Sequence, residues 1–577
     1  MNERSSFFLW VGAHRRSLNI AGLILVLVLS VICYHEVAGF EFLTWDDPQQ
    51  IIENQMVLDV PGVENTLKIF GSTVISHYQP LTTLSMNIVN WLFGTDPGAF
   101  HLFSLLLHLA NVALVYLLVS RLFPGSILPF FVAAFFAVHP MRVESVAWIT
   151  EQKGLLSSLF LLSSLLVYTG TDWAREGRKT GRYVLSLILF ILAMLSKASA
   201  ISLPFILLGY ELLLKRRRLS RRVLFRLAPF AAAALLLMLP TFLAHGDTGG
   251  FRPLAGLGVL DRTAIVVRNL FFYLRATLLP AGLSTVYSVP EDLISLRTFA
   301  VALALAGGVL LLIFNRRLRS SRMFLFGAVF YLVSIAPMLQ VVPFGRSPAA
   351  NRFSYLASVG VLICLAVLLR KLWRAFRWSR IPLILLAAGA LTASCVSTSE
   401  RLEIWRDSVS LWTDVLVENP DLSFAYYNLG QHYLISGDPG RAMEYYDRAI
   451  EIDSTVAGYY INRGNLLQAG GRPDLASNDY VAALRIDPED PAIRFNLGNA
   501  LRQMGYLEEA SNEYRYALQL DPSMADGWLN LGSCLAQMGR YPEALHCFDR
   551  ALQEDSTLET ARNNRLRLLQ EMGGSVP

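Results

Sequence analysis

Long apolar runs dominate the first 400 residues, and short polar segments rich in arginine and lysine separate them. A helix needs about 17 to 25 mostly apolar residues to cross a bilayer. The pattern therefore predicts an all-α, polytopic membrane domain over residues 1–400 with about eleven spans. These lie at about 18–37, 100–120, 125–141, 154–171, 183–197, 199–214, 227–244, 298–314, 323–341, 354–370 and 381–398.

One further apolar stretch, residues 264–283, does not fit a simple crossing because Arg268 and Arg275 interrupt it. Counting it as a span would also move the basic cluster that begins at Arg316 to the outer side of the membrane, against the positive-inside rule. We predict instead a re-entrant or amphipathic helix at the exoplasmic surface, and leave a full crossing open as the alternative.

After residue 400 the pattern changes to a repeat with a step of 34 residues. The repeated positions are Gly430, Gly464, Gly498 and Gly532, then Ala442, Ala476, Ala510 and Ala544, then Tyr446, Tyr480, Tyr514 and Phe548. Small residues where two helices approach, with an aromatic residue between neighbouring pairs, are typical of the tetratricopeptide repeat (TPR). We predict a linker helix at 401–420 and an α-solenoid at 421–577, with four repeats and a C-terminal capping helix.

Composition agrees with a membrane protein and argues against nucleic-acid binding. The 577 residues are 54% hydrophobic with a net charge of +5, and the basic residues gather beside the apolar runs instead of covering a soluble surface. The first run is followed by Glu41 and Trp45 and not by a small-residue cleavage site, which indicates an uncleaved span. The five cysteines show no metal-binding spacing.

The basic clusters also predict the orientation of the chain. Placing them in the cytoplasm and joining them through an odd number of spans puts the N-terminus in the cytoplasm. The first loop, residues 39–99, and the TPR region then lie on the exoplasmic side. A bacterial inner membrane with a periplasmic TPR region is the favoured location, and an endoplasmic reticulum membrane with a lumenal TPR region has the same topology.

This orientation gathers the ionisable residues of the apolar half on one side of the membrane. Such groups are costly near a bilayer, so their convergence indicates a polar site. Two adjacent carboxylates supply a general base where crowding raises a pKa, although an Asp-Asp-Pro sequence is more often a solvated turn or a helix N-cap. The candidate residues are Asp46, Asp47, His139, Glu144, Glu151, Lys153, Lys197, Arg346 and Arg352.

Three basic positions are candidates for holding an anionic headgroup. Lys153 lies in the segment that follows His139, where the alternative is an interfacial loop anchored by Trp148. Lys197 lies between two short spans and either holds a phosphate or reaches to the interface. Arg346 and Arg352 stand at the mouth of the tenth predicted span, and arginine suits bidentate phosphate binding.

Several short blocks along the chain also resemble a known family. They are Trp45-Asp46-Asp47-Pro48, Tyr78 to Ser85, Phe100-His101 with His108 and Asn111, His139-Pro140 through Trp148, Ser196-Lys197, and Asn351 to Leu356. Their order, followed by TPRs, is similar to that of the transmembrane-and-TPR (TMTC-type) O-mannosyltransferases and their bacterial relatives. The resemblance covers nearly the whole chain.

The resemblance implies a GT-C-type glycosyltransferase that moves a sugar, mannose in the family, from a polyprenyl-phosphate carrier to a protein hydroxyl on the exoplasmic side. Asp46 or Asp47 would deprotonate the acceptor, and Lys197, Arg346 and Arg352 would hold the phosphate leaving group. The TPR groove would bind the acceptor or a partner. The chain departs from the expected family pattern at Asn351, Gln152 and Gly154.

Two other functions stay open at this point. A membrane-anchored TPR scaffold for an exoplasmic complex would need no Asp46-Asp47 pair, and a transporter would need broken helices and an internal repeat of spans. No cofactor is predicted besides the lipid-linked sugar, and no metal site is assigned. A divalent ion bridging Asp46 or Asp47 to phosphate is the alternative.

Overall fold

The computed structural model describes residues 15–75, 77–171, 179–247, 258–288, 293–314, 321–341, 347–375 and 380–573. Within these ranges the regular elements are helices, and no strand occurs among them. The predicted all-α class is confirmed. The chain divides into two compact units, Met1–Val415 and Leu416–Pro577, here called the membrane unit and the TPR unit.

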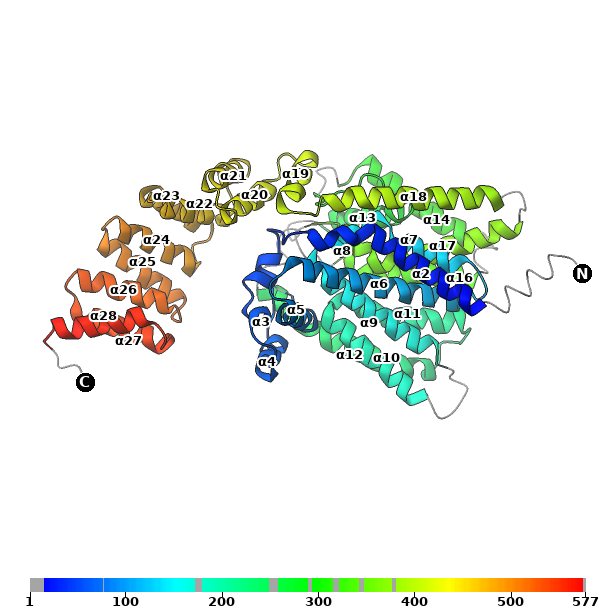
Figure 1. Cartoon of the computed structure of the whole chain (residues 1–577), viewed down its shortest axis with the longest axis horizontal. Coiled ribbons are helices and arrows are strands. Elements are labelled where there is room, and N and C mark those ends of the chain that lie inside the picture. The colour runs from blue at the N-terminus through cyan, green and yellow to red at the C-terminus, as the bar shows by residue number, and fades with distance from the viewer. Residues whose placement is uncertain are drawn as a thin grey trace, which may run out of the picture. The chain divides into compact units, whose positions relative to one another are not determined.

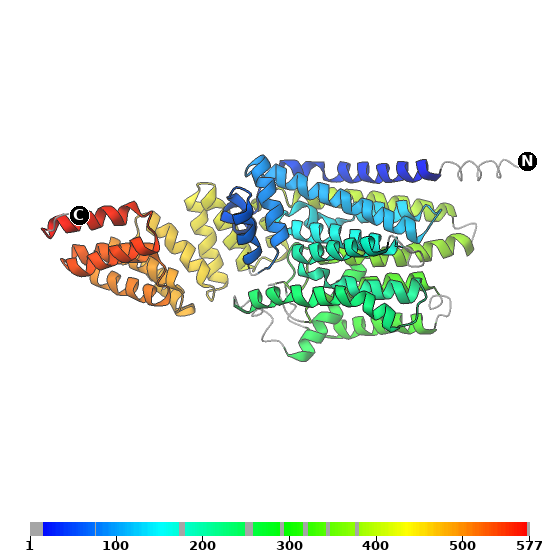
Figure 2. The same cartoon turned by 90° about the horizontal axis from the view of Figure 1, so that it is seen from below.

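The membrane unit is a bundle whose longer helices run largely side by side (Figures 1 and 2). A helix stands at each predicted span. The helices at the spans are α2 (Arg15–Tyr34), α6 (Pro97–Leu122), α7 (Leu128–Ala137), α9 (Gln152–Thr169), α10 (Lys179–Ser196), α11 (Leu203–Gly209), α12 (Arg221–Asp247), α14 (Leu296–Phe314), α16 (Arg322–Ile335), α17 (Ser354–Ala375) and α18 (Arg380–Glu403). Helix α13 (Val259–Leu278) lies in the ambiguous stretch 264–283.

Five helical segments are long and apolar enough to cross a membrane, or six if one bent pair counts as a span. They are Asn19–Gly39, Pro97–Leu122, Arg221–Leu243, Asn351–Ala375 and Arg380–Glu403. The other predicted spans coincide with shorter or less apolar helices in the described residues. The membrane character of the unit is therefore confirmed, while the number of eleven spans stays a prediction.

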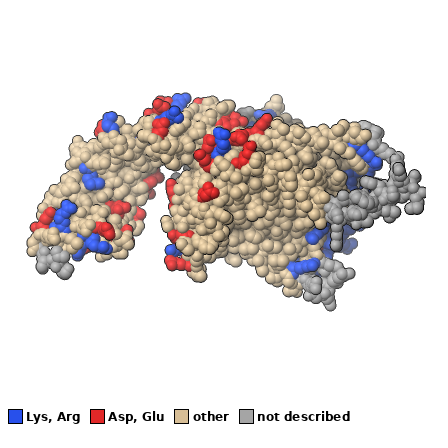
Figure 3. All heavy atoms as spheres, viewed as in Figure 1, with Lys and Arg blue, Asp and Glu red and all other residues tan. Residues whose placement is uncertain are grey.

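Exposed apolar side chains cover the outer surface of the bundle. Leu235 and Leu236 of α12 are 73% and 70% exposed, and Leu385 and Leu386 of α18 are 66% and 68% exposed. On the face of the membrane unit seen in Figure 3, a broad band carries no charged side chain, and the charges gather toward its two ends. Such a band suits contact with lipid, as expected of an integral membrane protein.

The third predicted span, residues 125–141, is shorter than expected because the chain bends at Pro140. Helix α7 ends at Ala137, and the next turn, η3 (Pro140–Arg142) with α8 (Val143–Ala147), leaves it at an angle of 55°. Proline has no N–H to continue a helix and disfavours helical geometry in the residue before it, here His139. The bend turns residues 140–153 inward, where the whole segment is buried.

The predicted first loop, residues 39–99, contains several short helices. These are η2 (Pro48–Ile52), α3 (Gln55–Leu58), α4 (Val63–Gly71) and α5 (Pro80–Phe93). Figures 1 and 2 show α3, α4 and α5 together at one end of the bundle. The 14 residues of α5 are too few to span a bilayer.

Helix α13 runs without interruption through most of the ambiguous stretch 264–283. It is absent from the segments that meet the length and hydropathy of a span. Tyr273 is fully buried, and Asn269 donates from Nδ2 to the backbone oxygen of Pro348 at 2.7 Å. No turn interrupts α13 between Val259 and Leu278, and whether this helix lies at the membrane surface or crosses the membrane stays a prediction.

The TPR unit is a row of antiparallel helix pairs. It contains α20 (Ser423–Ile435), α21 (Pro439–Ile452), α22 (Ala457–Ala469), α23 (Pro473–Ile486), α24 (Pro491–Gln503), α25 (Leu507–Leu520), α26 (Ala525–Gln537), α27 (Tyr541–Glu554) and α28 (Glu559–Glu571). The predicted solenoid is confirmed. A Cβ atom at Gly464 would lie 2.9 Å from the Tyr480 ring, so glycine permits the close approach of the two helices in a pair.

A second set of glycines, which the sequence analysis did not use, sets the turn within each pair. Gly437, Gly471, Gly505 and Gly539 have φ angles between 75° and 84° and are again 34 residues apart. Few other residues adopt this left-handed conformation without strain. The repeat is therefore maintained by backbone geometry as well as by side-chain packing.

Candidate functional site

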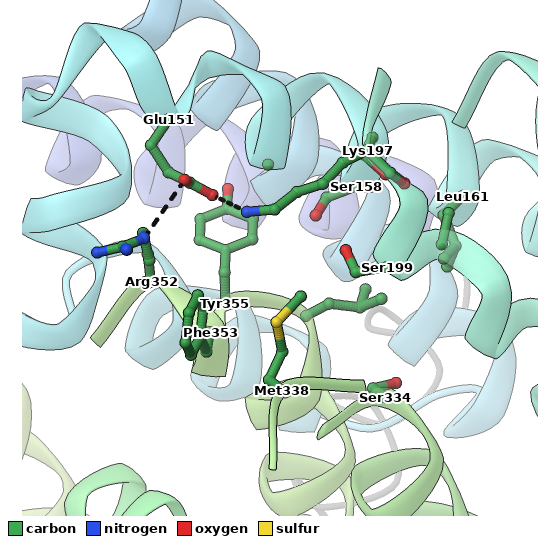
Figure 4. A pocket seen from close by; sticks show the side chains of 14 residues that line it. Glu151, Ser158, Leu161, Lys197, Ser199, Ser334, Met338, Arg352, Phe353 and Tyr355 are labelled. Atoms are coloured by element: carbon green, nitrogen blue, oxygen red, sulfur yellow. Dashed lines mark hydrogen bonds and ion pairs between the residues drawn. The ribbon is translucent and has the colours of Figure 1, made fainter. Parts of the chain in front are cut away.

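Four segments of the membrane unit bring charged side chains together at one pocket. Glu151 ends η4 (Ile149–Glu151), Lys197 precedes η5 (Ala198–Ser202), and Arg352 lies in η9 (Asn351–Phe353). Lys197 pairs with Glu151, while Arg352 pairs with Glu144 of α8 and lies 3.6 Å from Glu151 (Nε to Oε2). Figure 4 shows Lys197 and Arg352 on either side of the Glu151 carboxylate.

The two glutamates are buried more deeply than the two cations. The side chains of Glu144 and Glu151 are 1% and 2% exposed, whereas those of Lys197 and Arg352 are 18% and 17% exposed. Burial alone would raise the pKa of Glu151, but the charges of Lys197, Lys153 and Arg352 outweigh it and lower this pKa. Glu151 is therefore an anion that keeps the cations at the mouth of the pocket.

The pocket encloses about 440 Å³ of empty space, part of it open to solvent. Below the charged groups it is lined by serine hydroxyls and apolar side chains, and Ser334 Oγ is buried without a hydrogen-bond partner in the described part of the chain. Figure 4 shows Ser158, Ser199 and Ser334 around this space. A cationic mouth above hydroxyl groups suits a phosphate attached to a polar group.

Asp46 and Asp47 have different environments although they are adjacent in sequence. Asp47 is fully buried, accepting from the Leu43 N–H at 2.9 Å and from the Thr150 hydroxyl at 2.6 Å. Burial raises the pKa of Asp47 to about 6, against the opposing effect of these two donors. Asp46 is half-buried, and its charge acts on both Lys153 and Arg352. Asp46 is thus the less buried carboxylate of the pair and the one whose charge acts on two cations of the cluster.

Lys153 adds a third cation to the same cluster. It belongs to the first turn of α9, is buried, and interacts electrostatically with Glu151 and with Asp46. Neither Lys153 nor Arg142 lines the pocket itself. The Arg142 guanidinium is fully buried between the rings of Phe136 and Tyr355, at 5.4 and 5.2 Å from their centroids.

One predicted site residue of the described ranges, His139, is not part of this cluster. His139 is buried at the bend after α7, where Nε2 lies 3.1 Å from the Thr277 oxygen and Nδ1 accepts from the Met141 N–H. It ties the bend to the end of α13. Arg346 lies outside the described residues. No group of three or more histidine, cysteine, aspartate or glutamate side chains placed to hold a metal occurs in the described ranges. Whether a divalent ion bridges Asp46 or Asp47 to a phosphate stays a prediction.

The three departures from the family pattern have clear local environments. A Cβ atom at Gly154 would collide with the Glu151 carboxylate, so glycine leaves room for the Glu151–Lys197 pair. Gln152 Nε2 donates to the Phe100 oxygen at 2.8 Å. Asn351 donates to the Ser284 oxygen and accepts from the Tyr287 hydroxyl, at 2.7 and 2.8 Å.

Thr150 is a site residue that the sequence did not reveal. Its hydroxyl donates to Asp47 across 103 positions in the chain. A threonine in an apolar segment carries no signal of this contact, because only the bend at Pro140 brings it to the first loop.

Comparison with known proteins identifies both parts of the chain. Residues 78–243 match the family described as dolichyl-phosphate-mannose-protein mannosyltransferase. Residues 423–456 and 525–558 match the tetratricopeptide repeat, and 467–505 and 498–539 match a second TPR model. The mannosyltransferase match contains Glu144, Glu151, Lys153 and Lys197. It begins after Asp47 and ends before Arg352.

Curated relatives are named as protein O-mannosyl-transferases. Protein O-mannosyl-transferase F38B6.6 of Caenorhabditis elegans is 26% identical over 460 residues, which cover 76% of this chain and 64% of that protein. TMTC3 of Mus musculus is 30% identical over 196 residues, covering 32% of this chain and 21% of that protein. The resemblance to the TMTC family is confirmed. The chain nevertheless spans less than two thirds of these TMTC relatives.

Solved structures resemble the chain over a limited part of its length. MamA is 21% identical and covers 25% of this chain, with 85% of its own chain matched and a TM-score of 0.25. YrrB, titled a TPR protein with an unusual peptide-binding site, is 22% identical, covers 31% of this chain and 88% of its own, and has a TM-score of 0.26.

Proposed function

We propose that the chain is a GT-C-type membrane glycosyltransferase that moves a sugar, mannose in the first instance, from a polyprenyl-phosphate carrier to a hydroxyl of a protein acceptor. The observation that carries the proposal is the grouping of Lys197 and Arg352 with Glu151 at the pocket, together with the first-loop carboxylate Asp46, whose charge acts on Lys153 and Arg352. The mannosyltransferase family match and the names of the TMTC relatives support it.

The reaction assigns a task to each charged group. The acceptor oxygen forms a bond to C1 of the sugar, its proton passes to Asp46, and the bond between C1 and the phosphate oxygen breaks. The departing phosphate gains negative charge, which Lys197 and Arg352 stabilise from the pocket mouth. Lys153 supplies a positive charge that interacts with the charge of Asp46.

Glu144 and Glu151 hold the cations in place when no phosphate is bound. Lys153, Lys197 and Arg352 are balanced by Glu144, Glu151 and Asp46, so the cluster carries no net charge before a phosphate binds. The buried counter-ions fix the positions of the cations that the phosphate meets. Asp47 holds the first loop through Leu43 and Thr150 and acts on the reaction through Asp46.

The proposed setting follows the predicted topology. The N-terminus lies in the cytoplasm, and the first loop and the TPR unit lie on the exoplasmic face, periplasmic in a bacterial inner membrane or lumenal in the endoplasmic reticulum. The TPR groove binds the protein acceptor or a partner that delivers it. The donor enters from the lipid phase, which explains why a polar pocket is surrounded by apolar helices.

The test is sugar transfer from radiolabelled polyprenyl-phosphate mannose in membranes that contain the protein. The double variant Asp46→Asn/Asp47→Asn is compared with wild type at matched expression, and Asp487→Asn/Asp526→Asn, both on the exposed TPR surface, is the matched control. We expect the first-loop variant to lose transfer by about 100-fold or more and the control to keep it.

Two results would contradict the proposal. A first-loop variant as active as wild type would remove the carboxylates from the mechanism. Absence of transfer by every form, with several lipid-linked donors and native acceptors present, would favour the TPR scaffold over an enzyme.

A further inference from the structure

The first loop is attached to a segment of the membrane unit that lies more than 360 residues later. The Glu41 N–H donates to the Arg406 backbone oxygen at 2.9 Å. The Thr44 N–H donates to the Ser408 hydroxyl at 2.9 Å, and Thr44 and Ser408 are 6% and 1% exposed. These bonds stand immediately before Asp46 and Asp47 in the chain.

Four tryptophans reinforce the same attachment. Trp45 stacks on Trp148, with ring centroids 4.5 Å apart and 23° between the planes, and its ring lies 5.1 Å from that of Trp412. Trp148 in turn lies 6.1 Å from Trp405. Trp405 and Trp412 are almost completely buried. Aromatic contacts of this kind add to the free energy of burial and restrict rotation of each ring.

The tryptophan cluster is continuous with the charged pocket. The guanidinium of Arg352 lies 5.0 Å from the centroid of the Trp148 ring. A shift of Trp45 would therefore disturb both the backbone of Asp46 and the ring against which Arg352 packs. The cluster links the proposed base to a proposed phosphate ligand.

The segment that supplies Ser408 is itself held rigidly. Helix α19 (Ser408–Glu418) begins at Ser408, and Asp407 accepts from the Ser410 N–H at 2.7 Å at this helix start. Leu411 and Val415 are buried, as is Trp412. A simple connection between two units needs no buried hydroxyl aimed at a backbone N–H, since burying polar groups is costly unless they are paired.

We propose that Ser408 and Trp412 are positioning residues for the first-loop carboxylates. Ser408 holds the backbone of Thr44, and Trp412 holds the ring of Trp45, so that the next residue, Asp46, is kept in position. This inference rests on the proposed function for its catalytic meaning. A displacement of about 1 Å at a reacting group costs up to about 100-fold in rate.

The experiment uses the purified full-length chain and measures backbone hydrogen exchange together with sugar-transfer kinetics. Ser408→Ala removes the acceptor of the Thr44 N–H, and Val417→Ala, at an 80% exposed position of α19, is the control. We expect faster exchange over residues 41–48, a kcat lower by about tenfold or more, and an unchanged KM for the lipid donor. The control should match wild type in all three.

A second pair of variants separates positioning from loss of folding. Trp412→Phe keeps an aromatic ring against Trp45 and should retain most of kcat, whereas Trp412→Leu should lose it while exchange in the TPR helices α22–α27 stays unchanged. Unaltered exchange at residues 41–48 in Ser408→Ala, or a rise of KM with kcat preserved, would overturn the proposal.

Failure of the proposed function is a distinct outcome. If wild type transfers no sugar from any donor, the enzymatic proposal and the catalytic meaning of Ser408 fall together. The exchange measurement then decides separately whether Ser408 holds the first loop, because it requires no substrate.

Discussion

Two arginines, one in each unit, are bound by two carboxylates, yet they differ in how the chain assembles them. Arg463 of α22 pairs with Asp447 of α21 at 2.7 Å and with Asp479 of α23 at 2.6 Å, each 16 residues away. Arg352 pairs with Glu144, which is 208 residues away, and approaches Glu151.

The difference shows that the ion pairs of the TPR unit form between neighbouring helices, whereas those of the membrane unit require distant segments to meet. In a repeat protein each element contacts its neighbours, so the partners of Arg463 arrive as soon as adjacent helices pack. The cluster around Arg352 forms only when α8, η4, η5 and η9 meet, and its carboxylates are almost fully buried. Removing one charged side chain should therefore destabilise the membrane unit strongly, whereas in the TPR unit the loss of stability should stay confined to the neighbouring helices.

The largest expected effect is that of Lys197→Met. It leaves the buried Glu151 carboxylate with less compensating charge, which we expect to cost about 3–5 kcal/mol in stability and to abolish sugar transfer. Lys68→Met, which removes an exposed pair with Glu64, is the control and should change neither. Thermal unfolding in detergent and transfer assays provide the measurements.

The Glu151→Gln/Lys197→Met double variant sharpens the test. Removing the carboxylate as well should restore stability but not transfer, because the phosphate ligand is still absent. A Lys197→Met variant as stable as wild type would contradict the prediction, because removing a cation from the buried cluster would then cost no more stability than removing one from the exposed Lys68–Glu64 pair.

Gly154→Ala should have the next largest effect. The added Cβ would displace the Glu151 carboxylate, lowering stability by about 1–3 kcal/mol and transfer with it. Gly389→Ala in α18, where nothing lies within 4 Å of the added atom, is the matched control and should be neutral or stabilising. Equal transfer by the two variants would mean that the Glu151–Lys197 geometry does not matter.

Arg463→Ala tests the other side of the comparison. Asp479, only 5% exposed, loses a bidentate partner, and we expect a local cost of about 1–2 kcal/mol. Hydrogen exchange should accelerate in α21, α22 and α23 and stay unchanged in the membrane unit. Faster exchange in the membrane helices as well would contradict the view that the ion pairs of the TPR unit act only on neighbouring helices.

The smallest effect concerns pH. With the pKa of Asp47 near 6, the fold favours its protonated form, so Asp47 contributes stability at acid pH that is lost as pH rises through about 6. Transfer should increase over the same interval as Asp47 ionises. Thr150→Val removes a donor that lowers this pKa and should move the increase to higher pH, whereas Thr95→Val on the surface should not. A pH profile of kcat/KM checks both.

The TPR unit was predictable from sequence because its contacts repeat with the chain. Gly464 and Tyr480 are 16 residues apart, and the same pair recurs at each step of 34. The turn glycines, such as Gly471, could also have been found from their period, since a left-handed residue is needed once in every pair. Local geometry was enough in this region.

The membrane unit was predictable only in part. Apolar runs located the helices, and the positive-inside rule placed the candidate residues on one side, but neither indicated the bend at Pro140 that buries residues 140–153. His139 was grouped with the site from its place in sequence, whereas it bonds to the end of α13. Thr150 and Ser408 carried no signal at all.

Hydropathy and the 34-residue period by themselves determined a helical membrane region joined to a TPR solenoid, because both are properties of neighbouring residues. Only the tertiary structure decided that Asp47 is buried and accepts from the Thr150 hydroxyl while Asp46 stays half-buried, and that Ser408 holds the loop that carries them. The physical reason is distance along the chain. Charge pairing and burial depend on which distant segments are in contact, and the hydropathy pattern of the chain does not show those contacts.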